Sequence, residues 1–308
     1  MPLPTVIALI ALALGFGLQS QGRLPDRVKS WIAQGLIQVL YPSLIFSALL
    51  LRLNKDSLSA LWVLPFLVAM TLLLGLFAGL ALENKLGLSQ DSQKRSFRFL
   101  CLLPNYSYLP LMVAQALWGD YGITLVAIAG VGADLVLWTI GVPQIMVNRR
   151  FEARRLLLNP PLIALVMALL LLQTDFASLR TVIHPILEPL RSLGSATIPV
   201  SMLLLGAHLG RPTRGGKFNK AHGALLMLRL LLIPGALTLL FTFFPSLLAP
   251  LPRQVLILIA SMPGAIIAVV LSEIHGASPN FAARHILLGH GLWLLTGPLW
   301  LWLNFHLG

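Results

Sequence analysis

A short polar segment interrupts one of the long apolar stretches of the chain. It holds two prolines and three polar residues: Pro104, Asn105, Ser107, Tyr108 and Pro110. Pro110 lacks a backbone N–H donor, and its ring clashes with the carbonyl of Tyr106 four residues earlier. Irregular backbone inside a bilayer is tolerated only where protein buries it or water reaches it. The pattern predicts an interrupted helix whose polar side chains and free main-chain groups contact a substrate.

A second apolar stretch is interrupted near its middle by Ser261, Pro263 and Gly264. Paired interruptions in two apolar helices are the best sequence indication of a transporter binding site. The N-terminus of a half-helix presents free N–H groups and partial positive charge, which favour an anionic substrate. The alternative is two ordinary proline kinks, which are common in membrane helices. We expect seven residues from the two interruptions to form the substrate site: Asn105, Ser107, Tyr108, Pro110, Ser261, Pro263 and Gly264.

Two charged residues lie deep in apolar stretches. Asp134 costs a few kcal/mol to insert into a bilayer, so it either binds a coupling ion, H⁺ or Na⁺, or pairs with a cation. Arg229 either contacts an anionic substrate, neutralises Asp134, or extends to the cytoplasmic surface. We treat both as candidates for coupling or charge balance.

Enzymatic and cofactor chemistry are not indicated. No Walker loop, metal-ligand spacing or Ser-His-Asp arrangement occurs, and the single cysteine, Cys101, offers neither a disulfide nor a thiol metal cluster. We expect no enzyme activity, no metal and no cofactor.

Composition indicates an all-α membrane protein. The 308 residues are 57% hydrophobic and 10% charged, whereas a soluble domain has about 25% charged residues. The net charge of +12 comes from Lys and Arg clusters between apolar stretches. That placement is typical of cytoplasmic loops and argues against nucleic-acid binding.

Apolar stretches of about 20 residues predict roughly ten transmembrane helices. They lie near residues 3–19, 30–51, 59–82, 97–117, 122–147, 158–174, 182–209, 221–244, 252–273 and 282–306. The basic clusters follow helices one, three, five and seven, so these loops are cytoplasmic and both termini lie outside.

A basic segment divides the chain into halves with five predicted helices each. The halves are residues 1–148 and 158–308, and residues 149–157 are the cytoplasmic linker. Halves with odd helix numbers enter the membrane from opposite faces, so a shared fold makes them inverted repeats with broken, crossing helices four and nine. Pro42 and Ser43 in helix two correspond to Pro199 and Ser201 in helix seven, where we expect related helix breaks.

Together these motifs resemble the auxin efflux carrier family, in its short prokaryotic form. The likeness rests on residues 40–46, 105–119, 158–161, 198–207 and 262–265, and covers nearly the whole chain. It implies a homodimer in which helices one, two, six and seven form a scaffold. Helices three to five and eight to ten would carry the substrate across like an elevator. The family often has asparagine where this chain has Ile267 and a neutral polar residue where it has Asp134.

The combined expectation is a secondary transporter in the cell membrane that moves a small organic anion by alternating access, with efflux as the expected direction. One alternative is a sodium-coupled symporter of the bile-acid-carrier type. Another, from a different class, is a non-transporting membrane sensor or binding protein.

Overall fold

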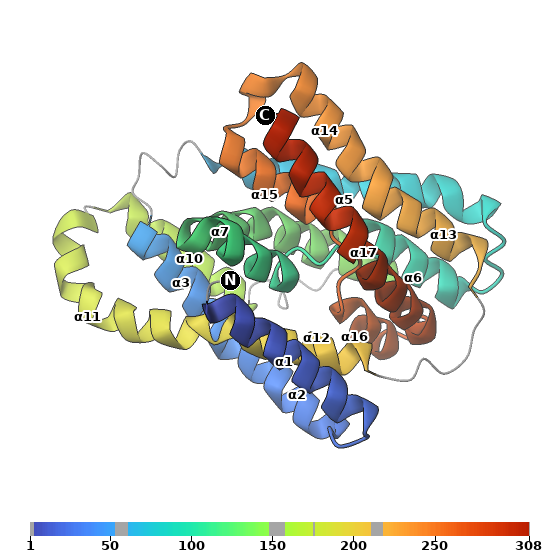
Figure 1. Cartoon of the computed structure of the whole chain (residues 1–308), viewed down its shortest axis with the longest axis horizontal. Helices are drawn as coiled ribbons and strands as arrows, with labels where there is room; N and C mark the ends of the chain where they lie inside the picture. Colours follow the sequence, from blue (N-terminus) through green and yellow to red (C-terminus); the bar gives the residue numbers. More distant parts are fainter. Residues whose placement is uncertain (1–2, 53–60, 148–157, 175, 211–217, 308) are drawn as a thin grey trace. The chain divides into compact units, whose positions relative to one another are not determined.

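The computed structural model describes residues 3–52, 61–147, 158–174, 176–210 and 218–307, and these are almost entirely helical (Figure 1). Six helices in these ranges are long and apolar enough to cross a membrane: Asp26–Leu51, Val63–Lys85, Tyr108–Ile145, Pro185–Leu209, Lys220–Phe243 and Pro279–His306. The prediction of an all-α membrane protein is confirmed at this level. The arrangement as two inverted five-helix repeats stays a prediction, and the linker 149–157 lies outside the described residues.

The helices group into two compact units, and each unit takes residues from both halves of the chain. Unit 1 comprises Met1–Trp62, Leu111–Val131 and Arg154–Pro212. Unit 2 comprises Val63–Pro110, Gly132–Ala153 and Thr213–Gly308.

Unit 1 is organised around close contact between α1 (Leu3–Ser20) and α12 (Thr197–Leu209). A Cβ added to Gly15 would lie 2.0 Å from the carbonyl oxygen of Leu203, and one added to Gly206 would lie 1.9 Å from that of Leu12. Only glycine lets the two backbones approach this closely. Unit 1 also contains α2 (Asp26–Gly35), α3 (Tyr41–Arg52), α10 (Pro160–Gln173), α11 (Phe176–Ser195) and residues 111–131 of α7 (Tyr108–Val136).

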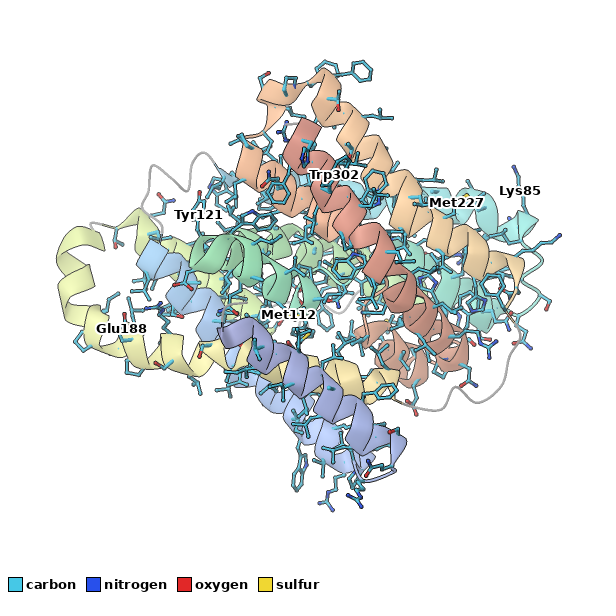
Figure 2. All side chains as sticks on the ribbon, in the orientation of Figure 1. Lys85, Met112, Tyr121, Glu188, Met227 and Trp302 are labelled. Carbon is cyan, nitrogen blue, oxygen red and sulfur yellow. The ribbon has the colours of Figure 1, made fainter. Side chains whose placement is uncertain are left out.

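Unit 2 contains a similar glycine contact between α5 (Val63–Leu82) and α6 (Asp91–Leu102). A Cβ on Gly75 would lie 2.1 Å from the carbonyl oxygen of Cys101, and one on Gly79 would lie 2.7 Å from the Cβ of Cys101. The outer surface of this unit carries apolar side chains, such as Met227 and Trp302 (Figure 2). Exposed apolar side chains are expected where a helix faces lipid. Unit 2 also contains the two ends of α7 (residues 108–110 and 132–136), α8 (Val142–Ile145), α13 (Lys220–Met227), α14 (Ile233–Phe243), α15 (Pro250–Ala260), α16 (Ile267–Ile274) and α17 (Pro279–Leu307).

Three helices widen into a single π-helical turn just before a proline. The turns are η1 (Leu36–Leu40) before Pro42, η3 (Leu137–Gly141) before Pro143 and η4 (Leu228–Leu232) before Pro234. Proline removes a donor and clashes with the carbonyl four residues earlier, so the preceding turn expands. For Pro234 the freed carbonyl belongs to Leu230, and it accepts a hydrogen bond of 2.7 Å from Nε1 of Trp300.

The two prolines predicted to break helices two and seven act differently. Pro42 is the second residue of α3 and follows the π-helical turn directly, so the chain bulges there without a gap. Pro199 is the third residue of α12, and α11 ends at Ser195 just before it. Ser43 and Ser201 donate to carbonyls of their own helices, at 2.7 and 2.8 Å.

The helix α7 (Tyr108–Val136) turns sharply at Gly119, whose φ of 60° and ψ of −147° suit glycine. With η3 and α8 it forms a helical stretch of 38 residues. A straight helix of that length would measure about 57 Å, roughly twice the hydrocarbon core of a bilayer. Gly119 therefore separates two arms, residues 108–118 and 120–145, which correspond to the end of predicted helix four and to helix five.

Candidate functional site

Both predicted helix interruptions are present in unit 2. The first separates α6, which ends at Leu102, from α7, which begins at Tyr108. The second separates α15, which ends at Ala260, from α16, which begins at Ile267. Each gap replaces helical hydrogen bonds with extended backbone, so main-chain donors and acceptors become available inside the protein.

The two interruptions lie against each other and pair as a short antiparallel bridge. The N–H of Asn105 donates to the carbonyl of Pro263 at 2.7 Å, and the N–H of Ala265 donates to the carbonyl of Leu103 at 3.3 Å. The bridge itself joins Pro104 and Gly264. These bonds fix the two broken helices to each other at their midpoints.

The structure brings most of the predicted substrate residues to this crossover. Asn105 is 3% exposed, and its Nδ2 has no hydrogen-bond partner. Ser107 is the buried N-cap residue of α7, but its side chain makes no capping bond. Tyr108 and Pro110 are the first and third residues of α7, half-buried and buried respectively. An unpaired amide donor and an uncapped helix terminus therefore lie within one short segment.

The second interruption contributes backbone more than side chains. The hydroxyl of Ser261 donates to the carbonyl of Leu258 at 2.9 Å, so its proton is already engaged within α15. The carbonyl of Pro263 is the acceptor for the crossover bond. A Cβ on Gly264 would lie 3.0 Å from Cδ2 of Leu100 and 3.2 Å from Cδ2 of His285, so the site is tightly packed around this glycine.

The helix starting at each interruption has an N-terminus without a side-chain cap. Ser107 precedes α7 and Ile266 precedes α16, and neither side chain accepts from the first turn. Ile266 has no acceptor to offer. The helix dipole gives each of these termini a partial positive charge.

Asp134 is held by a tyrosine from the interruption. The hydroxyl of Tyr106 donates to Oδ1 of Asp134 at 2.5 Å, and both side chains are buried. Arg229 is also fully buried, so its guanidinium does not extend to a surface of the unit. Its Nη1 donates to the carbonyl of Cys101 at 3.4 Å, and no ion pair joins it to Asp134 within the part of the chain that the structure describes.

Sequence reasoning missed three residues around this site. Tyr106 lay within the polar segment but was not selected, and His285 lacked metal-ligand spacing. Arg95 belongs to one of the Lys and Arg clusters between apolar stretches, yet it is buried. The groups that Tyr106, Arg95 and His285 contact at this site include residues far away in the sequence, so no local signal indicated these contacts.

Arg95, in α6, binds the C-terminal ends of two other helices of unit 2. Its Nη1 donates to the carbonyls of Ile145 at 2.8 Å and His275 at 3.1 Å, and its Nη2 donates to that of Gly276 at 2.8 Å. These carbonyls end α8 and α16, where a cation is favoured by the helix dipole. Arg95 therefore anchors the second broken helix to α6, the first half of the other.

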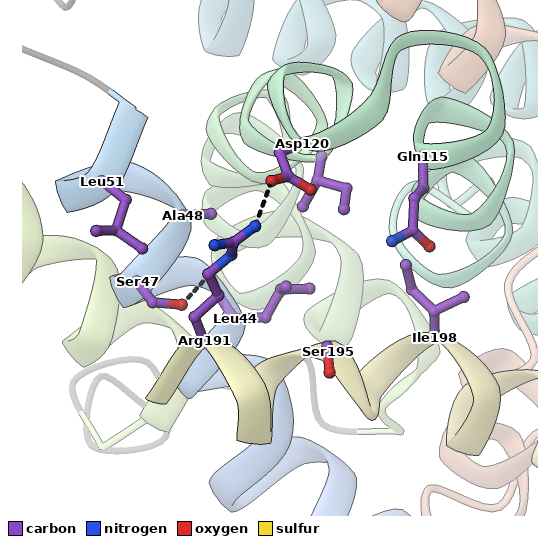
Figure 3. Close-up of a pocket in the computed structure, with 10 residues that line it drawn as sticks. Leu44, Ser47, Ala48, Leu51, Gln115, Asp120, Arg191, Ser195 and Ile198 are labelled. Carbon is purple, nitrogen blue, oxygen red and sulfur yellow. Dashed lines mark hydrogen bonds and ion pairs between the residues drawn. The ribbon is translucent and has the colours of Figure 1, made fainter. Parts of the chain in front are cut away.

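Unit 1 contains a cavity of about 270 Å³ (Figure 3). Two of the residues that line it form an ion pair, in which Nη2 of Arg191 lies 2.9 Å from Oδ2 of Asp120. The cavity is lined by Leu44, Ser47, Ala48, Leu51, Gln115, Asp120, Ile123, Arg191, Ser195 and Ile198. Three separate stretches of the chain form it, and no local sequence pattern indicates it.

Comparison with known proteins identifies sequences similar to this chain. The family model described as membrane transport protein matches residues 3–153 and 144–301. A protein of Methanocaldococcus jannaschii described as an uncharacterized transporter is 24% identical over 304 residues, which cover 97% of each chain. A protein of Methanothermobacter thermautotrophicus with the same description is 27% identical over 304 residues, covering 96% of each chain.

Proposed function

Because the chain belongs to the membrane transport protein family, the auxin efflux carrier family that its motifs resemble, we propose that it is a secondary active transporter of a small organic anion. A multi-pass membrane transporter, and not an enzyme, is the class to which its family and its two archaeal relatives belong. The proposal adds a substrate class, a mechanism and a direction to that class.

The observation that carries the proposal is the crossover of the two interrupted helices. Apolar helices otherwise satisfy their own backbone hydrogen bonds and offer little for a polar solute to bind. Here the bond between Asn105 and Pro263 holds two extended segments together in the interior of unit 2. Polar main-chain and side-chain groups of this kind are what a carrier needs to replace the hydration shell of its substrate.

The donors at the crossover favour an anion. The amide Nδ2 of Asn105 lacks a partner, and Ser107 leaves its hydroxyl free of any capping bond. The uncapped N-termini of α7 and α16 add partial positive charge. We assign substrate hydrogen bonds to Asn105 and Ser107.

An elevator-type movement is compatible with the internal organisation of unit 2. This unit contains both interruptions and the Asn105 to Pro263 bond. A substrate bound at the crossover would therefore move together with one compact body. Unit 1, which contains α1, α3 and α12, would serve as the scaffold.

The remaining features of the proposal concern the cellular setting. The protein exports its substrate from the cell, lies in the cell membrane as a homodimer, and has both termini outside. Transport is coupled to H⁺ or Na⁺ with Asp134 as the coupling residue, and the positive charge of Arg229 contributes to charge balance within the same unit. The placement of Lys and Arg clusters supports the orientation.

Counterflow in proteoliposomes tests the function. Liposomes containing the purified protein and an unlabelled monocarboxylate should accumulate the labelled acid, and protein-free liposomes should not. Accumulation that requires an inward sodium gradient would favour the bile-acid-type symporter. Binding of the acid to the purified protein without any flux would identify a sensor and contradict the carrier.

A further inference from the structure

The guanidinium of Arg229 is buried with most of its donors unused. It lies in η4 and is 0% exposed. Nη1 makes one long bond of 3.4 Å to the carbonyl of Cys101, while Nε and Nη2 have no partner. A buried charge without a partner is strongly unfavourable, because it loses its hydration and gains nothing in return.

The buried carboxylates of unit 2 do not pair with this charge. Oδ1 of Asp134 accepts from Tyr106, and both oxygens of Glu83 accept from Arg98. Among the described residues, no acidic side chain forms an ion pair with Arg229. No described side chain supplies the counter-charge, and an anion from solution can supply it.

The free edge of Arg229 has the geometry for a carboxylate. Nε and Nη2 lie on one side of a guanidinium and bind both oxygens of a carboxylate together. The same chain demonstrates this mode, since Nε and Nη2 of Arg98 each donate to one oxygen of Glu83, the second bond measuring 2.8 Å. Arg229 presents the same two atoms without the carboxylate.

Arg229 lies next to the crossover. The carbonyl that accepts from Arg229 belongs to Cys101, in the last turn of α6. This turn comes immediately before the segment that pairs with Pro263. His285 approaches Gly264 from α17, is 1% exposed, and has no partner for either ring nitrogen. His285 also lies within electrostatic range of Arg229.

We propose that Arg229 binds the carboxylate of the transported anion through Nε and Nη2, with His285 and Asn105 as neutral hydrogen-bonding groups beside it. This inference rests on the proposed function and makes its substrate a carboxylic acid. The positive charge selects the carboxylate over an uncharged analogue of the same shape. Arg229 therefore sets specificity as well as affinity.

Binding of matched probes to purified full-length protein tests the assignment. The probes are benzoate and phenylacetate, each compared with its uncharged amide, and the readout is the ratio of the two dissociation constants. In Arg229→Gln, carboxylate affinity should fall by at least about tenfold and the preference over the amide should disappear. Arg229→Lys retains the charge but not the paired donors, so its preference should be reduced but present.

Arg253→Gln is the matched control. Arg253 is also buried in unit 2 with an unpartnered Nε, but it lies over the ring of Phe241. This variant should keep the carboxylate preference of the wild type. If Arg229→Gln does not fold, the Arg229→Lys ratio decides, and an unchanged ratio there overturns the proposal.

Two further results separate this inference from related ones. Chloride that competes with benzoate at equal strength in the wild type would overturn the carboxylate assignment in favour of an inorganic anion. Proteoliposomes that exchange no carboxylate at all would remove the proposed function and this inference together. Exchange by the wild type with an unchanged preference in Arg229→Gln would remove only the inference.

Discussion

The backbone N–H of Asn105 donates a hydrogen bond of 2.7 Å to the carbonyl oxygen of Pro263, and this bond joins the two interrupted helices of unit 2. Each helix alone would leave its unpaired backbone groups in an apolar interior. Joined, they satisfy part of each other's backbone and leave side-chain donors such as Nδ2 of Asn105 free. The same residue, Asn105, therefore stabilises the fold through its backbone and offers a polar side chain for binding.

Gly75→Ala should destabilise unit 2. The added Cβ would lie 2.1 Å from the carbonyl of Cys101, so α5 and α6 must separate. Overpacking of this kind costs about 1–3 kcal/mol, and the thermal unfolding midpoint should fall accordingly. Gly291→Ala is the control, since nothing lies within 4 Å of its added Cβ. Equal midpoints for the two variants would contradict the close contact.

Arg95→Gln should lower the unfolding midpoint of the purified protein. The substitution removes the donors to the carbonyls of Ile145, His275 and Gly276. Hydrogen bonds from a charged donor contribute about 1.5–3 kcal/mol each, so we expect a loss of about 2 kcal/mol or more. The neighbouring Lys94→Gln affects an exposed contact with Asn84 and should change little. If the unfolding midpoint of Arg95→Gln equals that of Lys94→Gln, the hydrogen bonds of Arg95 do not contribute to the stability of the protein.

Comparison of Tyr106→Phe with Asp134→Asn should distinguish a structural role of Asp134 from a role in coupling transport to an ion gradient. Tyr106→Phe leaves the buried carboxylate of Asp134 without its donor and should destabilise the protein by about 1–3 kcal/mol. Asp134→Asn retains an acceptor for the tyrosine but no longer carries a negative charge. We expect this variant to fold and exchange substrate, while uptake driven by an imposed proton or sodium gradient is lost.

Gradient-driven uptake should be measured beside equilibrium exchange in the same liposomes. If Asp134→Asn responds to the gradient as the wild type does, the residue has no role in coupling. Tyr106→Phe provides the structural control, because it alters the same contact while retaining the carboxylate.

The helices and their interruptions were predictable from local sequence. Long apolar stretches indicate the helices, and Pro110 and Pro263 cannot continue a regular helix at their positions. The unpaired Nδ2 of Asn105 also lies where the polar segment indicated a site.

The contacts that complete the site were not predictable. The bond from Tyr106 to Asp134 and the packing of His285 against Gly264 join residues that are distant in the sequence. Periodicity and composition describe one segment at a time, so they do not say which segments meet. The burial of Arg95 is a further example, because a charge near a helix end usually faces water.

Counterflow by Asn105→Ala tests most directly whether the crossover is the substrate site. Asn304→Ala is the control, because Asn304 is also buried but its Nδ2 already donates to the carbonyl of Trp300 at 2.8 Å. With equal amounts of folded protein, Asn105→Ala should exchange a labelled monocarboxylate at least about tenfold more slowly, or with a correspondingly higher KM. Asn304→Ala should retain its KM. Exchange by Asn105→Ala at the wild-type rate and KM would contradict a substrate site at the crossed helices.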